Sequence, residues 1–271
     1  MDRAAVLAEY DEQIRRHPEV QAPGVEVERE GGVVRVVAAG EGLQGVMFSD
    51  LDESTADAAI AAQVERFATV PGEWEWKHHS HDRPADLPER LLRAEFVAEP
   101  AETLMVAEVA TLDVDVPPPD GVEIVAVEDA AGIDALVRVH DAVFGGDHSF
   151  VGRYLSAHLH DDPPTAVGVL AVADGGPVSS GRVELTHGTD FASLWGGGTV
   201  PRWRGRGVFR AMVAYRARLS AEAGFRYLQV DASDESRPIL ARLGFEALAV
   251  TIPFKRSGLT GRRSRGSGPG W

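Results

Sequence analysis

A glycine- and arginine-rich turn that opens a helix constrains this chain more than any other stretch. The turn reads Trp195-Gly-Gly-Gly-Thr-Val-Pro-Arg-Trp-Arg-Gly-Arg-Gly, and apolar residues at helical spacing follow it from Val208 to Leu219. Six arginines and no acidic residue lie between Arg202 and Arg218. Backbone N–H groups in a first helical turn, the helix dipole and neighbouring guanidinium groups all favour a bound phosphate. The stretch therefore predicts a site for a phosphate-bearing ligand.

Composition limits the class of protein around this turn. The 271 residues are 44% hydrophobic and 25% charged, which is typical of a globular protein with one large or two small domains. The formal net charge of −15 disfavours nonspecific binding to nucleic acid or to an anionic membrane. The absence of cysteine excludes disulfides and thiolate sites. The acidic N-terminus and the lack of a long apolar run lead us to expect a cytoplasmic protein.

Three consecutive prolines divide the chain. They remove backbone donors and fix φ, so neither a helix nor a central strand continues through them. We expect a linker at 117–121 between an N-terminal lobe, 1–116, and a second domain, 122–256. The last stretch, 257–271, contains Gly, Ser and Arg and little to bury, so it predicts a disordered basic tail. A solvated tail is the better interpretation of its charge than a nucleic-acid contact in a protein this acidic.

Apolar periodicity predicts elements on both sides of the linker. The N-terminal lobe has a first helix capped by Asp2 and a hairpin turning at Gly31. A strand, a helix ending near Phe67, a strand, a short helix and a last strand follow. The second domain has one strand, two helices, three antiparallel strands, the glycine turn with its helix, a strand, a short helix and a strand. The ranges expected there are 122–127, 130–143, 150–160, 165–173, 178–185, 191–200, 208–219, 225–231, 235–243 and 245–254.

A weak internal repeat connects the two lobes. The stretch from Trp76 to Phe96 has the strand, loop, helix and terminal Phe of the stretch from Leu228 to Phe245. Both place an Asp and a Pro before a Leu-rich helix. The N-terminal copy has no glycine–arginine turn upstream, so we interpret it as a degenerate relative of the second domain.

The element order from Val122 to Phe254, with Val-Pro-Arg-Trp-Arg-Gly-Arg-Gly and Arg242-Leu-Gly-Phe, resembles the GNAT-type N-acetyltransferase superfamily. The resemblance covers about half of the chain and reaches the N-terminal lobe through the repeat. It implies an α/β (α+β) fold with a mixed, mostly antiparallel central sheet flanked by helices, in two related lobes in tandem. In that family the turn holds the pyrophosphate of acetyl-CoA, and the preceding strand lies along the pantetheine arm. The resemblance therefore implies acetyl-CoA as co-substrate.

The resemblance also implies which residues contact acetyl-CoA. The family pattern Arg/Gln-x-x-Gly-x-Gly/Ala fits in two registers, beginning at Arg202 or at Arg204. The second register better fits the distance from Pro201 and the start of the helix, although it places Phe209 at the last small position. The implied contacts are Gly198, Thr199, Val200, Arg204, Gly205, Arg206, Gly207, Val208, Phe209 and Arg210.

Catalysis in such enzymes needs a group that removes a proton from the attacking ammonium. The amine attacks the thioester directly in a ternary complex, and a backbone N–H of the strand before the turn polarises the carbonyl. Glu184 lies on an expected strand that borders the slot for the thioester. Asp231 ends the strand that follows the helix after the glycine turn. Asp190 and His187 lie nearby in sequence. Each of these groups also fits a solvated or capping role, so the base stays open.

The proton donor for the departing thiolate is less clear from the sequence. The family often has a Tyr four residues before the Gly of Leu-Gly-Phe, and this chain has Leu240 there. Ser236 and Ser233 are alternatives, and either also fits a helix cap. Asp147 and His148 lie between two helices, in the region that shapes the acceptor site in this family.

A metal site is not expected. His79 and His81 would share one face of a strand, but a His pair without a third well-placed ligand is a weak zinc signal.

We therefore expect a cytoplasmic, acetyl-CoA-dependent N-acetyltransferase that acts on a small amine or an amino group of a metabolite. The N-terminal lobe would pack on the active lobe, shape the acceptor cleft or carry a homodimer contact. Neither nucleic acid nor a membrane is an expected partner. One alternative is a non-catalytic acyl-CoA-binding sensor, which Leu240 supports. A second alternative is a nucleotide-binding protein that uses the same turn.

Overall fold

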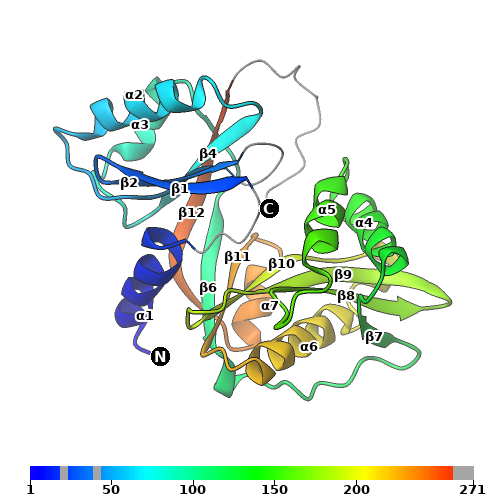
Figure 1. The fold of residues 1–271 in the computed structure, drawn as a ribbon. Helices are drawn as coiled ribbons and strands as arrows, with labels where there is room; N and C mark the ends of the chain where they lie inside the picture. The colour runs from blue at the N-terminus through cyan, green and yellow to red at the C-terminus, as the bar shows by residue number, and fades with distance from the viewer. Residues whose placement is uncertain (19–23, 39–43, 259–271) are drawn as a thin grey trace. The chain divides into compact units, whose positions relative to one another are not determined.

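The computed structural model describes residues 1–18, 24–38 and 44–258, which form two compact units (Figure 1). Unit 1 contains Met1–Leu104 and the described residues 248–258, and unit 2 contains Met105–Ala247. The division between them falls inside a strand, and the prolines at 117–119 belong to unit 2. The expected tail, 257–271, lies outside the described residues from position 259 onward.

Unit 1 begins with helices and continues with a sheet. The strand order is β1-β2-β3-β4-β12, in which β3 and β4 are parallel and the other neighbours antiparallel, and the short β5 pairs with β12. The hairpin between β1 and β2 turns at Gly31 and Gly32, as expected, and both glycines have positive φ. The elements are α1 (Arg3–Tyr10), the π-helix η1 (Asp11–Arg16), β1 (Val25–Glu30), β2 (Val33–Ala38), β3 (Gly45–Ser49), α2 (Ala56–Phe67), β4 (Glu73–His79), α3 (Leu87–Arg93), β5 (Val97–Ala98) and β12 (Glu246–Ser257).

The core of unit 1 forms around two tryptophans of β4. Trp74 and Trp76 alternate along the strand and are both buried against residues of α2 and α3. Phe67 stacks on Trp74 at 4.3 Å between ring centroids, and Phe96 meets Trp74 edge-on at 4.9 Å. The alternation in the sequence thus gives this strand one aromatic face.

Unit 2 contains the further strands of the sheet, with helices on both faces. Its strand order is β6-β11-β10-β9-β8-β7, in which β10 and β11 are parallel, whereas β7 to β10 are antiparallel. In Figure 1, α4 and α5 lie on one side of β8 and β9, and α6 lies on the other. The elements are β6 (Glu102–Glu108), the 3₁₀ turn η2 (Val109–Thr111), β7 (Glu123–Ala126), α4 (Ala130–Phe144), α5 (Ser149–His158), β8 (Ala166–Ala173), β9 (Gly176–Leu185), β10 (Phe191–Thr199), the 3₁₀ turn η3 (Pro201–Trp203), α6 (Val208–Glu222), β11 (Tyr227–Ala232) and α7 (Arg237–Arg242).

The two units repeat one order of elements. Each has two helical segments, three antiparallel strands, a helix, a strand parallel to the third one, a short helix and a strand. In unit 1 this order runs from α1 to β5. The second copy runs from α4 through α7 of unit 2 to β12, whose residues from Leu248 onward belong to unit 1. The similarity between the stretches 76–96 and 228–245 is therefore the last part of a longer repeat that covers this whole order of elements. The expected fold class, a mixed and mostly antiparallel sheet flanked by helices in two related lobes, is confirmed.

In the described part of the chain, no helix is both long and apolar enough to cross a bilayer.

Candidate functional site

The glycine–arginine turn lies between β10 and α6 of unit 2. Gly205 and Gly207 have φ of +72° and +88°, which residues with a Cβ rarely adopt. Gly207 is the N-cap, and no side chain among the described residues caps α6. The ladder of the helix begins with Ala211 N donating to Gly207 O at 3.1 Å. The N–H groups of the preceding three residues, 208–210, therefore have no acceptor within the helix.

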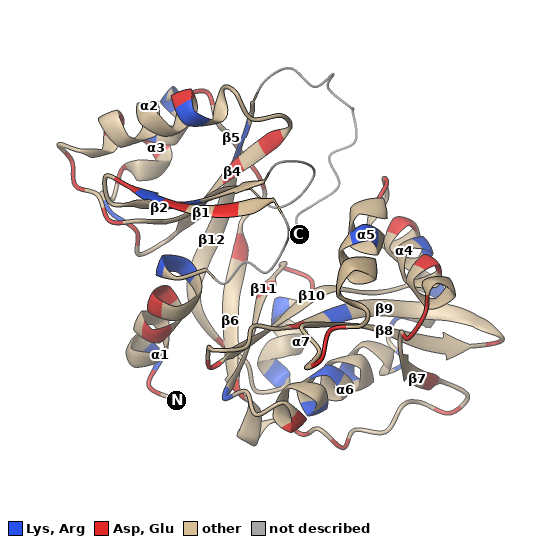
Figure 2. Cartoon of the chain, in the orientation of Figure 1, with Lys and Arg blue, Asp and Glu red and all other residues tan. Residues whose placement is uncertain are grey.

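Arginine side chains surround this open helix end. Arg204, Arg206 and Arg210 are exposed, and the first turn of α6 holds no acidic residue. Arg204 Nε donates to Thr199 O at 2.9 Å, and Arg206 lies 4.8 Å from the ring centroid of Trp203. Figure 2 shows the positive residues that continue along α6. A helix N-terminus with this charge can bind a phosphate group.

The helix begins at Val208, which favours the motif register that starts at Arg204. That register places Phe209 where the family has a small residue. The ring of Phe209 is half-buried against the apolar core of unit 2. A Cβ on Gly197 would lie 3.2 Å from Phe209 Cε2, so the missing side chain at Gly197 makes room for the ring.

The strand before the turn parts from its parallel neighbour. Residues Phe191–Ser193 of β10 pair with Tyr227–Gln229 of β11. Both strands continue beyond these residues without further pairing to each other. The register between β10 and β9 then shifts between Trp195 and Gly198, and Gly196 within this bulge has φ +55°. A bulge bends its strand and frees backbone groups from the ladder.

A buried arginine from α6 contacts the same bulge. Arg216 is 1% exposed, and its Nη1 donates to Arg182 O at 3.3 Å and approaches Trp195 O at 3.5 Å. Burial lowers the pKa of Arg216 to about 10, and the charge of Arg182 acts in the same direction. A Cβ on Gly181 would lie 2.7 Å from Arg216 Nη1, so this glycine makes room for the guanidinium group.

Polar side chains of β9 face α4 and α5. Arg182 Nε donates to Glu184 Oε1 at 2.7 Å, and the guanidinium group lies 5.5 Å from the ring centroid of Tyr154 and 5.4 Å from that of Trp195. Burial raises the pKa of Tyr154, as do the charge of Glu184 and a hydrogen bond to it. Glu184, expected as a base, is therefore engaged by Arg182 and Tyr154.

His140 on α4 lies beside these residues and was not expected from the sequence. It is 2% exposed, and its Nδ1 lies 3.0 Å from Ser180 Oγ. Its Nε2 is buried with no hydrogen-bond partner among the described residues. Burial lowers the pKa of His140 to about 4, and the charges of Arg182 and His148 add to this effect. The only sequence signal that could have pointed to His140 was its place on the apolar face of the helix predicted at 130–143.

The other predicted catalytic residues lie on β11 and α7. Gln229 Nε2 donates to Ser193 Oγ at 2.5 Å, and Asp231 follows two residues later, half-buried on the same strand. Ser236 is the N-cap residue of α7, and its hydroxyl donates to Ser233 O at 3.3 Å. Leu240, where the family often has Tyr, is 1% exposed in the apolar core.

The remaining candidates are engaged locally. His187 Nε2 lies 2.8 Å from Pro164 O, and Asp190 O accepts from Tyr227 N at 2.9 Å. Asp147 Oδ1 accepts from Ser149 N at 2.8 Å, and His148 Nδ1 lies 3.0 Å from Asp141 Oδ1.

The turn before the equivalent helix of unit 1 contains a carboxylate, although no described side chain caps that helix. Asp52, between β3 and α2, accepts hydrogen bonds from Ser54 N at 2.8 Å and Thr55 N at 2.9 Å. These bonds and those from the two hydroxyl groups, with Ser54 the largest contributor, lower the pKa of Asp52 to about 2.

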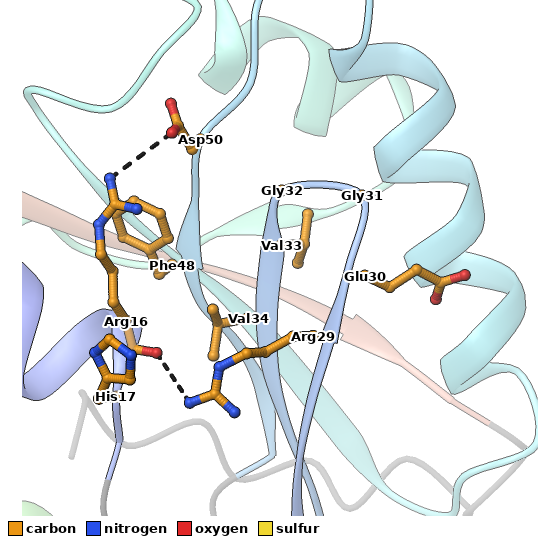
Figure 3. A pocket seen from close by; sticks show the side chains of 10 residues that line it. All are labelled: Arg16, His17, Arg29, Glu30, Gly31, Gly32, Val33, Val34, Phe48 and Asp50. Atoms are coloured by element: carbon orange, nitrogen blue, oxygen red, sulfur yellow. Dashed lines mark hydrogen bonds and ion pairs between the residues drawn. The ribbon is translucent and has the colours of Figure 1, made fainter.

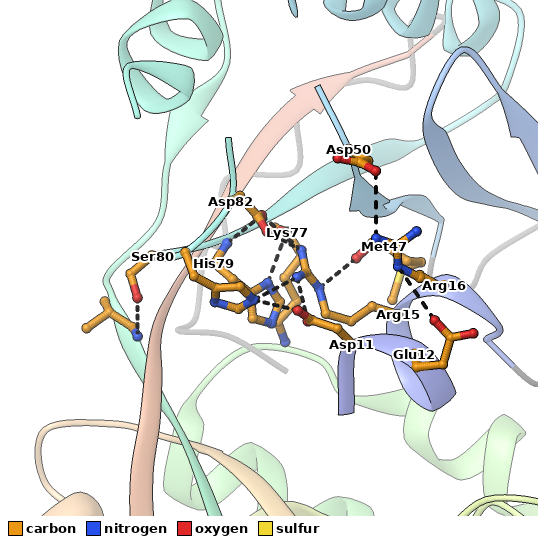
Figure 4. A network of polar contacts seen from close by, with 12 residues as sticks. Asp11, Glu12, Arg15, Arg16, Met47, Asp50, Lys77, His79, Ser80 and Asp82 are labelled. Atoms are coloured by element: carbon orange, nitrogen blue, oxygen red, sulfur yellow. Dashed lines mark hydrogen bonds and ion pairs between the residues drawn. The ribbon is translucent and has the colours of Figure 1, made fainter. Parts of the chain in front are cut away.

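An ionic network of unit 1 contains Asp11, Arg15 and Asp82 (Figure 4). β4 ends at His79, so the expectation that His79 and His81 share one strand face is wrong. His81 lies in the following loop, where its Nε2 is 2.8 Å from Asp11 Oδ2. Arg15 Nη2 donates to both carboxylate oxygens of Asp82, at 2.8 and 2.9 Å. The described residues contain no group of three or more His, Asp or Glu that could hold a metal ion.

Unit 1 also has a hollow of about 410 Å³ beside the β1–β2 hairpin (Figure 3). Arg16 lies 4.1 Å from the ring centroid of Phe48 and 3.7 Å from Asp50 Oδ2. Arg29 Nη2 donates to Arg16 O at 3.2 Å. None of the residues predicted for ligand binding or catalysis lines this hollow.

Comparison with known proteins identifies the fold. No family model and no curated protein matches the sequence. Among solved structures, a GCN5-related N-acetyltransferase from Kribbella flavida superposes with a TM-score of 0.70 at 17% identity, over 95% of this chain and 96% of that one. A GCN5-related N-acetyltransferase from Sphaerobacter thermophilus gives 0.60 at 17%, over 96% and 92%. A tandem GNAT protein from the clavulanic acid biosynthesis pathway gives 0.57 at 14%, over 89% and 85%. The chain therefore has the tandem GNAT fold.

Proposed function

We propose that this chain, which has the fold of the GCN5-related N-acetyltransferases, is an acetyl-CoA-dependent N-acetyltransferase. One observation carries the proposal: the N-terminus of α6 has no side-chain cap and no acidic residue in its first turn, and it follows a strand that parts from its parallel neighbour. The open helix end suits a pyrophosphate, and the parting of β10 from β11 suits an extended arm between the two strands. Sequence reasoning expected both features from one motif.

The residues of unit 2 fit such a donor. Gly205 and Gly207 have no side chain to block a phosphate from the N–H groups of 208–210, and the exposed guanidinium groups of Arg204, Arg206 and Arg210 supply charge. Backbone groups of 198–200 would hold the pantetheine. When bound, acetyl-CoA supplies the thioester whose acetyl group is transferred. The corresponding turn of unit 1, from Asp50 to Thr55, contains acidic residues and neither glycine nor arginine.

Side chains of this protein would accept the proton of the attacking amine and donate a hydrogen bond to the departing thiol. We propose Asp231 and Glu184 as proton acceptors for the attacking amine, and Ser236 as a hydrogen-bond donor to the departing thiol. Glu184 would first have to weaken its 2.7 Å contact with Arg182. A backbone N–H of the β10 bulge would polarise the thioester carbonyl.

The acceptor is proposed to be a small amine or an amino group of a metabolite. Unit 1, with Asp52 at its equivalent helix end, would shape the acceptor site or carry a homodimer contact instead of binding a donor. A cytoplasmic location is part of the proposal, and cell fractionation tests it.

Calorimetry with acetyl-CoA and with ATP tests the proposal, followed by release of free CoA thiol with a panel of amines. We expect acetyl-CoA binding, no ATP binding, and thiol release that requires an amine. Binding without transfer to any amine would favour the non-catalytic sensor, which agrees with the core position of Leu240. ATP binding without acetyl-CoA binding would contradict the proposal and favour a nucleotide site.

A further inference from the structure

Arg182 on β9 has a guanidinium edge that its ion pair with Glu184 does not use. Its Nε donates to Glu184 Oε1 at 2.7 Å, and within the described part of the chain neither of its Nη nitrogens has a hydrogen-bond partner. Neither Nη nitrogen is among the buried atoms that lack a partner, so solvent reaches both of them. The side chains of Arg182 and Glu184 are 12% and 22% exposed. A ligand can therefore reach this edge while the ion pair stays in place.

The geometry of the unused edge suits a carboxylate. The guanidinium carbon of Arg182 lies 5.5 Å from the ring centroid of Tyr154 on α5 and 5.4 Å from that of Trp195 on β10. Contacts with two aromatic rings stabilise the cation and restrict the orientation of its plane. The two Nη groups of a fixed guanidinium present parallel N–H donors, which match the two oxygens of a carboxylate.

The charges around this edge are more positive than negative. Arg216 is 1% exposed, and its Nη1 donates to Arg182 O at 3.3 Å. Burial lowers the pKa of Arg216 and the charge of Arg182 lowers it further, with no carboxylate of the described chain acting against them. Glu184 is the one carboxylate in the described residues that pairs with either arginine. Two arginines against one carboxylate repel a ligand that carries only positive charge and attract one that also carries a carboxylate.

The ion pair lies beside the segment of β10 that we propose for the thioester. Arg182 is the register partner of Trp195, where regular pairing of β9 with β10 stops before the bulge, and Glu184 is the register partner of Ser193. Ser193 is also the last residue of β10 that pairs with β11. Neighbouring strands of a sheet are about 4.8 Å apart. The pair is therefore one strand away from the point where β10 and β11 part.

We propose that Arg182 and Glu184 recognise an acceptor that carries its amine and a carboxylate on the same carbon, which is an α-amino acid. This inference rests on the proposed acetyl-transfer function and names the substrate class of that site. The carboxylate accepts from the Nη groups of Arg182, and the ammonium group donates to Glu184. Because the two protein charges are in contact, the two charges of the ligand must also be adjacent. A long diamine or an ω-amino acid does not meet this condition.

The same arrangement explains how Glu184 becomes available to the amine. A carboxylate on the Nη edge shares the charge of Arg182 and weakens the attraction between Arg182 and Glu184. Glu184 is then better able to accept a proton from the ammonium group. An amine without a carboxylate leaves the ion pair at full strength.

Wild-type kinetics with matched acceptors test the inference without any variant. Each set contains an α-amino acid, its amide and the corresponding amine without a carboxyl group, such as leucine, leucinamide and isopentylamine, and further sets vary the side chain. Release of free CoA thiol from acetyl-CoA gives kcat/KM. We expect at least one amino acid to exceed its own amide and amine by about 10²-fold. Amides or amines used as well as every amino acid would overturn the inference and leave the acetyltransferase function standing. Absence of acetyl-CoA binding would instead overturn both.

Variants of the full chain then test the role of Arg182. In Arg182→Gln we expect KM for the preferred amino acid to rise by about 10²-fold, while KM for its amine and the Kd for acetyl-CoA change by less than about 3-fold. Arg182→Lys keeps the charge without the paired donors, so it should recover part of the loss. The matched control is Arg153→Gln, because Arg153 is exposed on α5 and donates to Ser149 Oγ at 3.1 Å. It should keep the wild-type preference. A folded Arg182→Gln variant that also keeps this preference would overturn the inference.

Discussion

Three consecutive glycines of β10 leave room for three different side chains. A Cβ on any of them would come close to a neighbouring helix. The nearest contacts would be Gly196 with His140 at 2.1 Å, Gly197 with Phe209 at 3.2 Å and Gly198 with Val143 at 2.7 Å. The sequence predicted this stretch as part of the strand 191–200, and the strand is bulged here. Which side chains fill the space depends on tertiary packing, and local sequence does not encode it.

A single carboxylate at the open end of α6 should abolish donor binding. Gly207 has φ +88°, and only Pro119 Cγ lies near a Cβ there, at 3.6 Å, so Gly207→Asp has space but incurs backbone strain. The new charge would lie where the N–H groups of 208–210 favour an anion. We expect acetyl-CoA affinity to fall by at least about tenfold in calorimetry, with the chain still folded.

The matched control is Gly188→Asp in the turn between β9 and β10. Gly188 has φ +91° and open space, so it adds the same charge and similar strain outside the motif. Equal affinity of Gly207→Asp and Gly188→Asp for acetyl-CoA would remove the turn from the donor site.

At the scale of elements, a buried ion pair fixes η1 of unit 1 to the loop after β4. The side chains of Arg15 and Asp82 are 3% and 2% exposed, and Asp82 also accepts from His79 N at 2.9 Å. Asp11 on the same helical segment pairs with Arg15 at 2.8 Å. Burial alone would raise the pKa of Asp11, but the hydrogen bonds and charges of His81 and Arg15 outweigh it and lower that pKa.

Removing one partner of this pair should be strongly destabilising. Asp82→Ala leaves the buried guanidinium group of Arg15 without its bidentate carboxylate, so we expect a loss of about 3–5 kcal/mol in the free energy of unfolding. Chemical denaturation followed by circular dichroism measures it. The control, Asp86→Ala, removes the exposed partner of Arg90 on α3 and should change stability much less. Equal losses in the two variants would show that the buried pair adds nothing.

A second ionic cluster links β1, β2 and α2 and should depend on pH. Arg66 Nη2 lies 2.5 Å from Glu28 Oε1, and Arg35 Nε donates to Glu28 Oε2 at 2.7 Å. The bonds from Arg66, then those from Arg35, lower the pKa of Glu28 to about 2 against the usual 4.5. The stabilisation is therefore complete above about pH 4.5 and disappears as pH falls toward 2.

We expect the stability difference between the wild type and Glu28→Gln to shrink between pH 4.5 and pH 2. Urea unfolding at a series of pH values measures it. The control is Glu65→Gln, an exposed residue of α2, whose difference from the wild type should vary less over the same range. A Glu28→Gln difference that stays constant down to pH 2 would contradict the assignment.

At the scale of the whole molecule, two repeated units differ at the one place where a donor would bind. In unit 2 the helix end follows Gly207 and is surrounded by arginines, whereas in unit 1 Asp52 already accepts from Ser54 N and Thr55 N. The two units therefore share one architecture but differ in the chemistry of this turn.

This difference predicts a binding stoichiometry. Titration of the full chain with acetyl-CoA should give about one site per chain, because unit 2 has glycines and arginines at this turn, whereas unit 1 has Asp52 there and Asp57 in the first turn of α2. The Gly207→Asp variant should lose that single site. Two sites per chain, or one site that survives in Gly207→Asp, would place a donor in unit 1.

Much of the fold was predictable because apolar periodicity follows element type closely. The order of strands and helices after Val122 and the glycine turn came from spacing and turn residues alone. The π-helix Asp11–Arg16 and the pairing of β12 with β4 were not predicted, because long-range contacts decide both. The last strand runs three residues further than expected, to Ser257.

The candidate site was predictable only in its backbone part. The turn residues have a local signature, and the helix start at Val208 agrees with it. The engagement of Glu184 by Arg182 and the orphaned nitrogen of His140 depend on which helix covers which strand. A histidine on an apolar helix face is usually a core residue, so the sequence alone gave no reason to select it.

The return of β12 to unit 1 reverses the order in which the units are finished during synthesis. Thr251–Ser257 pair with His79–Glu73, and Val250 N donates to a side chain 170 residues earlier, Ser80 Oγ. On the ribosome, β4 is made early but lacks this neighbour until almost the whole described chain has emerged. The nascent N-terminal half must therefore keep an unpaired strand edge from associating with other chains while unit 2 is translated. The unit that is translated first is the last to be completed.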